Sequence, residues 1–455
     1  MDGESAGSDG MMRQLSAQEL RQVLQLHERY LARHDDGRRA VLAFCDLTAA
    51  DLSGHDLSGA DLTGARLHRT ILSNARLQNA NLFAADLRVA NLNGADLSGA
   101  DMRGSCLRGA QLNRAKLPKA DLRKGVVVRF RGTDGENSPL TENARTDLSS
   151  VEARDADLSG ARLSEASVVR ANLTDANLRD TDLCGADLRQ ADATGAVLER
   201  ADLSGANLSG ASLRGAVLSK VKFGGAVLDG VDISGAIVDP KLLQEARQLQ
   251  LKGCDLKSIS LDELGETLRL HALWLDTRGG DGKRAVLADH DLSGRDLRAA
   301  NLALANLARA VLRGADLTRA SLAMCDLSLA DLREARLDRA DLRGAKLVRA
   351  HLAGASLVRA NLAPLDNVGD GKFDFPANLE GAKLGGANLE NARLHQARLA
   401  GADLSRSNLD HADLSEADLG GANLSEVTAD TASFAGADLN EARGLPKMLE
   451  RAPRC

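Results

Sequence analysis

The side chains in this sequence with the most chemical potential are its carboxylates. Aspartate recurs directly before leucine at a five-residue spacing, as at Asp51, Asp56 and Asp61. Carboxylates act as acids, bases or metal ligands where several of them converge on one point. A carboxylate at the same position of every unit instead forms a regular outward row. We therefore interpret these aspartates as turn residues that accept hydrogen bonds from nearby backbone N–H groups.

The nine histidines and six cysteines also offer no chemical constellation. They are dispersed along the chain, with no C-x-x-C and no H-E-x-x-H, and the sequence has no P-loop. His27 and His271 fall within apolar helical patterns, which favours a packing or capping role over a ligand role. Cys45 and Cys325 fall at an inward position of the repeat, and scattered single thiols are typical of structural residues. We expect no catalytic residue, no cofactor and no metal site, and hence no enzyme.

All of these residues belong to a five-residue unit of the form small–polar–Leu–x–x. The leucines of about 65 such units fall into four runs, which cover residues 42–122, 148–238, 287–362 and 379–439. An α-helix would rotate successive leucines by about 140° and spread them over every face. A continuous strand would alternate them between two faces, because five is odd. The chain must therefore turn once per unit, and four turns close a square coil of about twenty residues, with coils stacked about 4.8 Å apart.

This pattern resembles the pentapeptide-repeat family, whose consensus is A-(D/N)-L-x-x, over roughly 71 % of the chain. The resemblance implies an all-β solenoid, a right-handed quadrilateral β-helix whose core consists of Leu, Phe and Ala ladders. The composition agrees with a thin core without large rings, since aromatic residues make up only 2 % of the chain.

Two segments interrupt the repeats and match each other. Residues 20–42 and 264–287 share the pattern L-x-x-x-L-x-x-H-x-x-(Y/W)-L, which predicts an amphipathic helix of about three turns. Ser16 and Ser260 are the predicted N-caps, each with a glutamate three residues later. We expect two tandem β-helices with short helical caps. Residues 1–14 form a disordered tail, residues 15–257 the first module with an insertion at 124–146, and residues 258–455 the second with an insertion at 363–377.

Composition and charge exclude several classes of protein. No run of about 18 apolar residues is present, and the first twelve residues lack the apolar core of a secretory signal. The formal net charge is −6, which argues against a protein held to nucleic acid or to a membrane surface by a basic field. Unpaired cysteine spacing favours reduced thiols and a cytoplasmic location.

The predicted function is a scaffold or adaptor that binds protein partners through rigid faces, with the irregular segments 126–143 and 364–376 as the preferred contact sites. The sequence does not name the partner. The resemblance further implies that the duplication is a covalent pseudo-dimer, which predicts a monomer in solution.

Two alternatives remain open. Some members of the family mimic duplex DNA through an acidic rod and regulate or protect type II topoisomerases. Residues twenty apart should share a face, and there the acidic rows are broken by basic residues, as in the three columns Asp46, Arg66, Asp86, Cys106; Asp56, Arg76, Asp96, Lys116; and Asp296, Asp316, Arg336, Ser356. The other alternative is an enzyme whose site is built by the two insertions.

Overall fold

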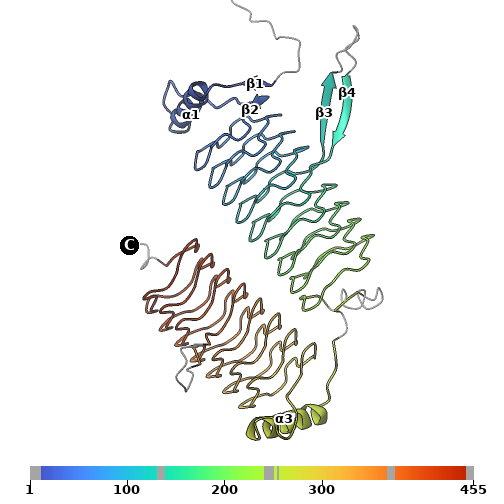
Figure 1. Cartoon of the computed structure of the whole chain (residues 1–455), viewed down its shortest axis with the longest axis vertical. Helices are drawn as coiled ribbons and strands as arrows, with labels where there is room; N and C mark the ends of the chain where they lie inside the picture. The colour runs from blue at the N-terminus through green and yellow to red at the C-terminus, as the bar shows by residue number, and fades with distance from the viewer. Residues whose placement is uncertain (1–11, 131–138, 240–250, 254–255, 366–374, 447–455) are drawn as a thin grey trace, which may run out of the picture. The chain divides into compact units, whose positions relative to one another are not determined.

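The computed structural model describes residues 12–130, 139–239, 251–253, 256–365 and 375–446. The chain divides into two compact units, of which the first comprises Met1–Asp232 with Val238–Leu251 and the second Ile233–Ile237 with Lys252–Cys455. Each unit contains a stack of four-sided coils built from the five-residue repeat (Figure 1).

Backbone pairing between successive coils holds each stack together. The residue before each leucine pairs in parallel with the residue twenty positions later, as Asp51 does with Ile71 and Asp56 with Arg76. The leucine N–H donates to the carbonyl of the next coil (Leu52 N to Ile71 O, 2.8 Å). The twenty-residue coil predicted from the leucine spacing is therefore confirmed, and most backbone groups inside the coil are satisfied.

The core of each unit consists of stacked leucine and alanine ladders. In the second unit, Leu292, Leu312 and Leu332 are fully buried, and so are the alanines two residues before most leucines, such as Ala310 and Ala330. Only a small side chain fits at this second inward position, because the walls of the narrow coil approach one another closely there. The predicted inward cysteines Cys45 and Cys325 occupy this alanine position and are buried.

Each corner of the coil is turned by a residue in the left-handed region. Glycine is common there, as at Gly54 with φ +66°, because it adopts this conformation without a steric cost. Other residues take the same conformation, including Arg69 with φ 56°. The side chain of a corner residue points away from the core, so corners are where large polar groups project into solvent.

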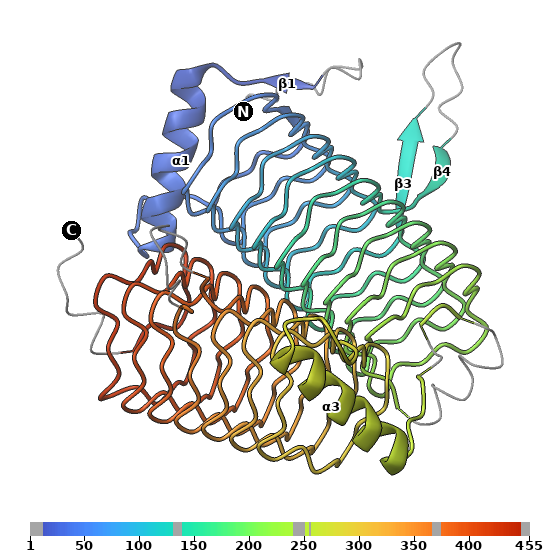
Figure 2. The same ribbon diagram turned by 60° about the horizontal axis from the view of Figure 1, so that its bottom comes forward.

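The two helices expected from the matching segments are present. Helix α1 spans Ala17–Leu31 and helix α3 spans Leu261–Asp276. Ser16 and Ser260 are their N-caps, and both capping boxes form as predicted. In Figures 1 and 2, α1 lies beside the first coils of the first unit, and α3 lies beside the first coils of the second unit.

The expectation of a disordered tail through residue 14 is wrong at its end. Strand β1 (Arg13–Gln14) pairs in parallel with strand β2 (Cys45–Asp46). The first coil has no preceding coil, so its β-edge would be open, and β1 supplies the missing partner. Gln14 Nε2 adds a hydrogen bond to Asp46 Oδ2 at 3.1 Å. Residues 1–11 lie outside the described residues.

The two insertions leave the coils without breaking the stack. Strands β3 (Gly125–Phe130) and β4 (Pro139–Ala144) form an antiparallel hairpin that projects from the first unit (Figure 1). Beyond it, Cys106 pairs with Asp147, so the coil resumes in register at the end of the hairpin. In the second unit Lys346 pairs with Asn378, and the register resumes in the same way. Both insertions leave at a corner, and the ladders continue on the far side.

Candidate interaction surfaces

The regular faces carry the aspartates and asparagines that precede each leucine. Their Oδ1 atoms accept the backbone N–H two residues later, as in Ser53 N to Asp51 Oδ1 (3.0 Å) and Thr48 N to Asp46 Oδ1 (3.0 Å). The predicted turn role of these residues is therefore confirmed. Each such carboxylate therefore accepts a local backbone hydrogen bond at Oδ1, as a turn residue does.

Where aspartate precedes the leucine and arginine follows it, the two side chains form a bidentate ion pair within one unit. At Asp296, Arg298 donates from Nε (2.9 Å) and Nη2 (2.6 Å). These hydrogen bonds from Arg298 lower the pKa of Asp296 to about 2. The same arrangement occurs at Asp86–Arg88, Asp101–Arg103, Asp121–Arg123, Asp187–Arg189, Asp331–Arg333 and Asp341–Arg343. In each of these pairs the negative charge of the aspartate is balanced by an arginine of the same unit.

Ion pairs also run between coils. Arg66 Nη1 lies 3.1 Å from Asp46 Oδ2, and Lys222 Nζ lies 3.0 Å from Asp202 Oδ2, in each case twenty residues apart. The predicted columns are confirmed by the backbone, since Asp46 with Arg66 and Arg66 with Asp86 form parallel β-bridges between successive coils. A phosphate mimic needs an unbroken row of negative charge, and these columns alternate in sign instead.

His27 and His271 are fully buried and hold the backbone where each helix meets its first coil. Nδ1 of His27 accepts from Ala40 N, and Nδ1 of His271 accepts from Ala285 N, both at 3.1 Å. Nδ1 is thus the unprotonated nitrogen, and Nε2 of His271 donates to Ala303 O at 3.0 Å. Nε2 of His27 makes no hydrogen bond of normal geometry among the described atoms. Burial lowers the pKa of both imidazoles, although a contact with the Ser58 backbone opposes part of the lowering of the pKa at His27. Both histidines act as packing and capping residues, as predicted.

The four cysteines in the described part of the chain are free thiols. Burial raises the pKa of Cys45, Cys106 and Cys325, and burial together with a hydrogen bond to Asp182 raises the pKa of Cys184 to about 12. A thiol is reactive as its thiolate, so these cysteines are poor nucleophiles. Within the described ranges, no group of three or more His, Cys, Asp or Glu is placed to hold a metal ion.

The insertions predicted as contact sites are only partly visible. The backbone of β3 and β4 is defined, while the side chains of 126–143 and residues 366–374 lie outside the described residues. At the base of the second insertion, Leu365 and Phe375 form an antiparallel bridge, and Phe375 is 42 % exposed.

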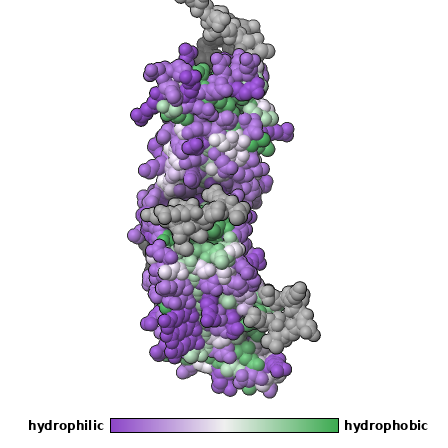
Figure 3. All heavy atoms as spheres, turned by 90° about the vertical axis from the view of Figure 1, so that its left-hand side faces the viewer, coloured by the Kyte–Doolittle hydropathy of each residue, from purple (hydrophilic) through white to green (hydrophobic). Residues whose placement is uncertain are grey.

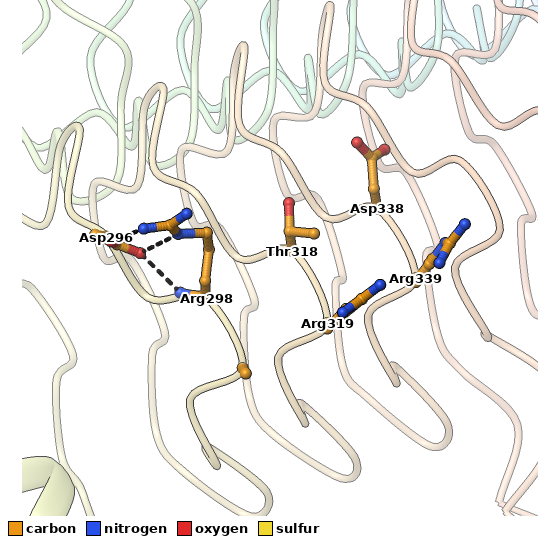
Figure 4. Close-up of a pocket in the computed structure, with 7 residues that line it drawn as sticks. Asp296, Arg298, Thr318, Arg319, Asp338 and Arg339 are labelled. Carbon is orange, nitrogen blue, oxygen red and sulfur yellow. Dashed lines mark hydrogen bonds and ion pairs between the residues drawn. The ribbon is translucent and has the colours of Figure 1, made fainter.

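A shallow hollow on the second unit was not expected from the sequence. It is open to solvent, has a volume of about 600 Å³ and lies along one face between the corner residues of three successive coils. Figure 4 shows the Asp296–Arg298 pair at one end and Arg319 and Arg339 projecting in parallel at the other. Ala299, Thr318 and Asp338 complete the lining. The signal in the sequence was arginine at a twenty-residue interval, which counting by five-residue units did not reveal.

Outside this hollow, the faces of the coils are mostly polar. Hydrophilic residues cover most of the side shown in Figure 3, with small hydrophobic areas between them. Exposed apolar side chains include Val41 and Phe44 in the first unit and Val286 and Leu304 in the second. No helix in the described ranges is long and apolar enough to cross a membrane.

Comparison with solved structures returns repeat proteins of the same kind. The pentapeptide-repeat protein Rfr23 from the cyanobacterium Cyanothece 51142 is 31 % identical over 30 % of this chain and 91 % of its own, with a TM-score of 0.22. HetL from the cyanobacterium Nostoc sp. strain PCC 7120, described as involved in heterocyst differentiation regulation, is 21 % identical over 94 % of each chain, with a TM-score of 0.15. Full-length QnrB1, a plasmid-mediated fluoroquinolone resistance protein, is 13 % identical over 66 % of this chain and 95 % of its own, with a TM-score of 0.24. These scores carry no argument about function.

The comparison with curated proteins finds no match. The family described as pentapeptide repeats matches residues within 40–118, 144–235, 285–363 and 377–443. These segments cover well over half of the sequence and coincide with the stacked coils. The chain belongs to the pentapeptide-repeat family.

Proposed function

We propose that this protein is a non-enzymatic scaffold whose rigid faces and two insertions bind protein partners. The observation that carries the proposal is the state of the polar side chains on the faces. Carboxylates that precede leucine bind a backbone N–H two residues on, and many also pair with an arginine or lysine. Such a surface offers flat, ordered polar contacts and leaves few free groups for proton transfer.

Two modules in one chain would each offer a surface for binding protein partners. We propose two tandem right-handed β-helices, 15–257 and 258–455, each begun by a helix that covers the open end of its first coil. The buried histidine of each helix supports this role, because it accepts the N–H of Ala40 or Ala285 at the start of the coil. The duplication is then a covalent pseudo-dimer, and light scattering should show a monomer. A stable homodimer would count against it.

The register of the coils gives a deletion that tests the first insertion. Removing residues 125–145 joins Lys124 to Thr146, which restores an uninterrupted repeat. A matched deletion of 365–376 joins Pro364 to Ala377 and does the same in the second unit. Because both deletions keep the phase of the repeat, both variants should fold.

The assay is capture of proteins from the native host by the full-length chain and by each deletion variant. We expect at least one partner to bind the full-length chain and to be lost from one deletion variant, with thermal stability unchanged. If both variants capture the same proteins as the full-length chain, the insertions are not the contact sites.

The alternative of a DNA mimic acting on a type II topoisomerase finds less support in the charge pattern. Arg66 and Arg76 interrupt the acidic columns and lie 3.1 and 3.5 Å from the aspartates of the preceding coil. A supercoiling assay with gyrase separates the two hypotheses, since a scaffold of this kind should leave gyrase activity unchanged at stoichiometric concentrations.

A further inference from the structure

Three arginines occupy the same corner of successive coils in the second unit, and we call them the arginine ladder: Arg319, Arg339 and Arg359. All three are exposed. All three have a left-handed backbone, with φ of 60°, 59° and 61°. Glycine is the cheapest residue in this conformation, but arginine also occupies other corners, such as Arg69 and Arg309.

Direct pairing of the coils sets the spacing of the ladder. Arg319 N donates to Asp338 O, and Arg339 N donates to Val358 O, both at 2.9 Å. Adjacent rungs are therefore about 4.8 Å apart, and the whole ladder rises about 10 Å. In Figure 4 the side chains of Arg319 and Arg339 extend in the same direction from neighbouring coils. Both line the hollow of about 600 Å³.

Among the described residues, the three ladder arginines have no counter-ion, unlike Arg298 on the same face. Arg298 is held by Asp296 through two hydrogen bonds. Asp338, the acidic neighbour of the ladder, accepts hydrogen bonds from Ser356 Oγ and from Val358 N (3.1 Å). For the three ladder guanidinium groups, the described part of the chain supplies no ion pair. Three like charges one coil apart repel one another, and an anion placed between them would remove that repulsion.

The extent of the ladder limits the kind of anion. The level before Arg319 carries Ala299, and the level after Arg359 carries Asn391 beside Glu390, so the basic strip spans three coils only. Nucleic acid binding calls for a longer basic track and for aromatic side chains that stack on bases, and the sequence 296–362 has no Phe, Tyr or Trp. The hollow is open, so a small molecule would not be enclosed.

An extended peptide meets these limits. Its alternate side chains lie about 7 Å apart on one side, within reach of flexible arginines on successive rungs. We propose that the arginine ladder is a docking site for a short acidic segment of a protein partner, which deepens the scaffold function proposed above and rests on it. The carboxylates of the segment would pair with the guanidinium groups from one side of the coil.

The test is the affinity of a fluorescently labelled hexaglutamate peptide, measured by anisotropy with the full chain at about 50 mM salt, where surface charges are weakly screened. The test variant replaces the ladder (Arg319→Gln, Arg339→Gln and Arg359→Gln). The control variant replaces three exposed arginines that lie at separate sites of the first unit (Arg69→Gln, Arg154→Gln and Arg214→Gln). Both variants lose three positive charges, so a general electrostatic effect would weaken them equally.

We expect the ladder variant to bind the peptide at least about tenfold more weakly than the unaltered chain and the control variant to stay within about twofold. The melting curve of the ladder variant should not fall below that of the unaltered chain. Absence of binding to the unaltered chain, or equal loss in both variants, overturns the proposal. Tighter binding of an oligothymidylate than of hexaglutamate, lost in the ladder variant, would assign the site to nucleic acid and overturn it as well.

This outcome is separable from the outcome of the capture experiment. The deletion of 125–145 leaves the second unit intact and should bind hexaglutamate as the full-length chain does. If the deletion removes a host partner while the ladder variant still binds the peptide normally, the ladder proposal fails and the scaffold function stands.

Discussion

Replacement of the two buried histidines by asparagine tests how the helices are attached to their coils. The Oδ1 atom of asparagine occupies the place of Nδ1 and can still accept the N–H of Ala40 or Ala285. His271→Asn also loses the Nε2 hydrogen bond to Ala303 O, a half-buried carbonyl, at a net cost of about 0.5–1.5 kcal/mol. His27→Asn should cost less, since the contact of His27 with the Ser58 backbone falls outside normal hydrogen-bond geometry.

Both variants lose a stacked ring, because His27 lies on Tyr30 (5.9 Å between ring centroids) and His271 on Trp274 (5.7 Å). This shared loss cancels in the comparison. His271→Asn should therefore destabilise the second unit by up to about 1.5 kcal/mol more than His27→Asn destabilises the first, or by roughly 1–6 °C in melting temperature. Scanning calorimetry measures both units, and fluorescence of Trp274, the single tryptophan, reports on α3. Equal losses in the two variants would refute the hydrogen-bond account.

The same histidines predict an acid-sensitive attachment. Their folded pKa lies below the unfolded value of 6.5, because burial penalises the imidazolium. The unfolded chain binds more protons between the two values, so stability falls as the pH drops below about 6.5 and is fully present above it. The midpoint of unfolding should decrease between pH 7.5 and pH 5, and the double variant His27→Asn/His271→Asn should lose part of that dependence. An unchanged pH profile in the double variant would contradict this reasoning.

Three further predictions concern the core, the thiols and the helix cap. Leu322 is fully buried in the leucine core, and Leu322→Ala should lower the free energy of unfolding in urea by about 2–5 kcal/mol. Leu304→Ala, at a side chain that is 40 % exposed, should cost far less. Similar costs would argue against the buried leucines as the source of stability. Cys184 and Cys325, whose thiol pKa values are raised, should react with a thiol reagent at neutral pH far more slowly than a free cysteine, and rapid labelling in the native state would disprove it. Ser260→Ala removes the N-cap of α3 and should lower unfolding stability by about 0.5–2 kcal/mol, with Ser260→Asp as the control that retains the cap.

The coil was predictable because its period is incompatible with both a helix and a flat strand. Asp51 and Ile71 had to become neighbours once four turns closed a coil, and the phase of the leucines already marked where the insertions lie. The helices were predictable from Ser16, Ser260 and the spacing of their apolar residues. Strand β1 was not, since Arg13 and Gln14 form it only because the edge of the first coil needs a backbone partner, which no side-chain pattern records.

The local role of the carboxylates was also predictable, because one position repeated dozens of times cannot be a unique site. The hollow beside Arg319 and Arg339 was less accessible to sequence reasoning. Its charge depends on which arginines form an ion pair with an aspartate, and side-chain geometry determines that pairing. Arg298 lies two residues after Asp296 and is paired, while the ladder residues occupy the corner positions of their units.

The way the hairpin departs at Gly125 and the chain returns at Arg145 has a consequence for how such a protein can change. Each coil pairs through its backbone with the coils before and after it. Extra sequence inserted at a corner is therefore tolerated if the repeat resumes in the same register. Peptides or small domains can therefore be grafted at residues 124–146 without redesign of the interior, because the coils on both sides keep their pairing.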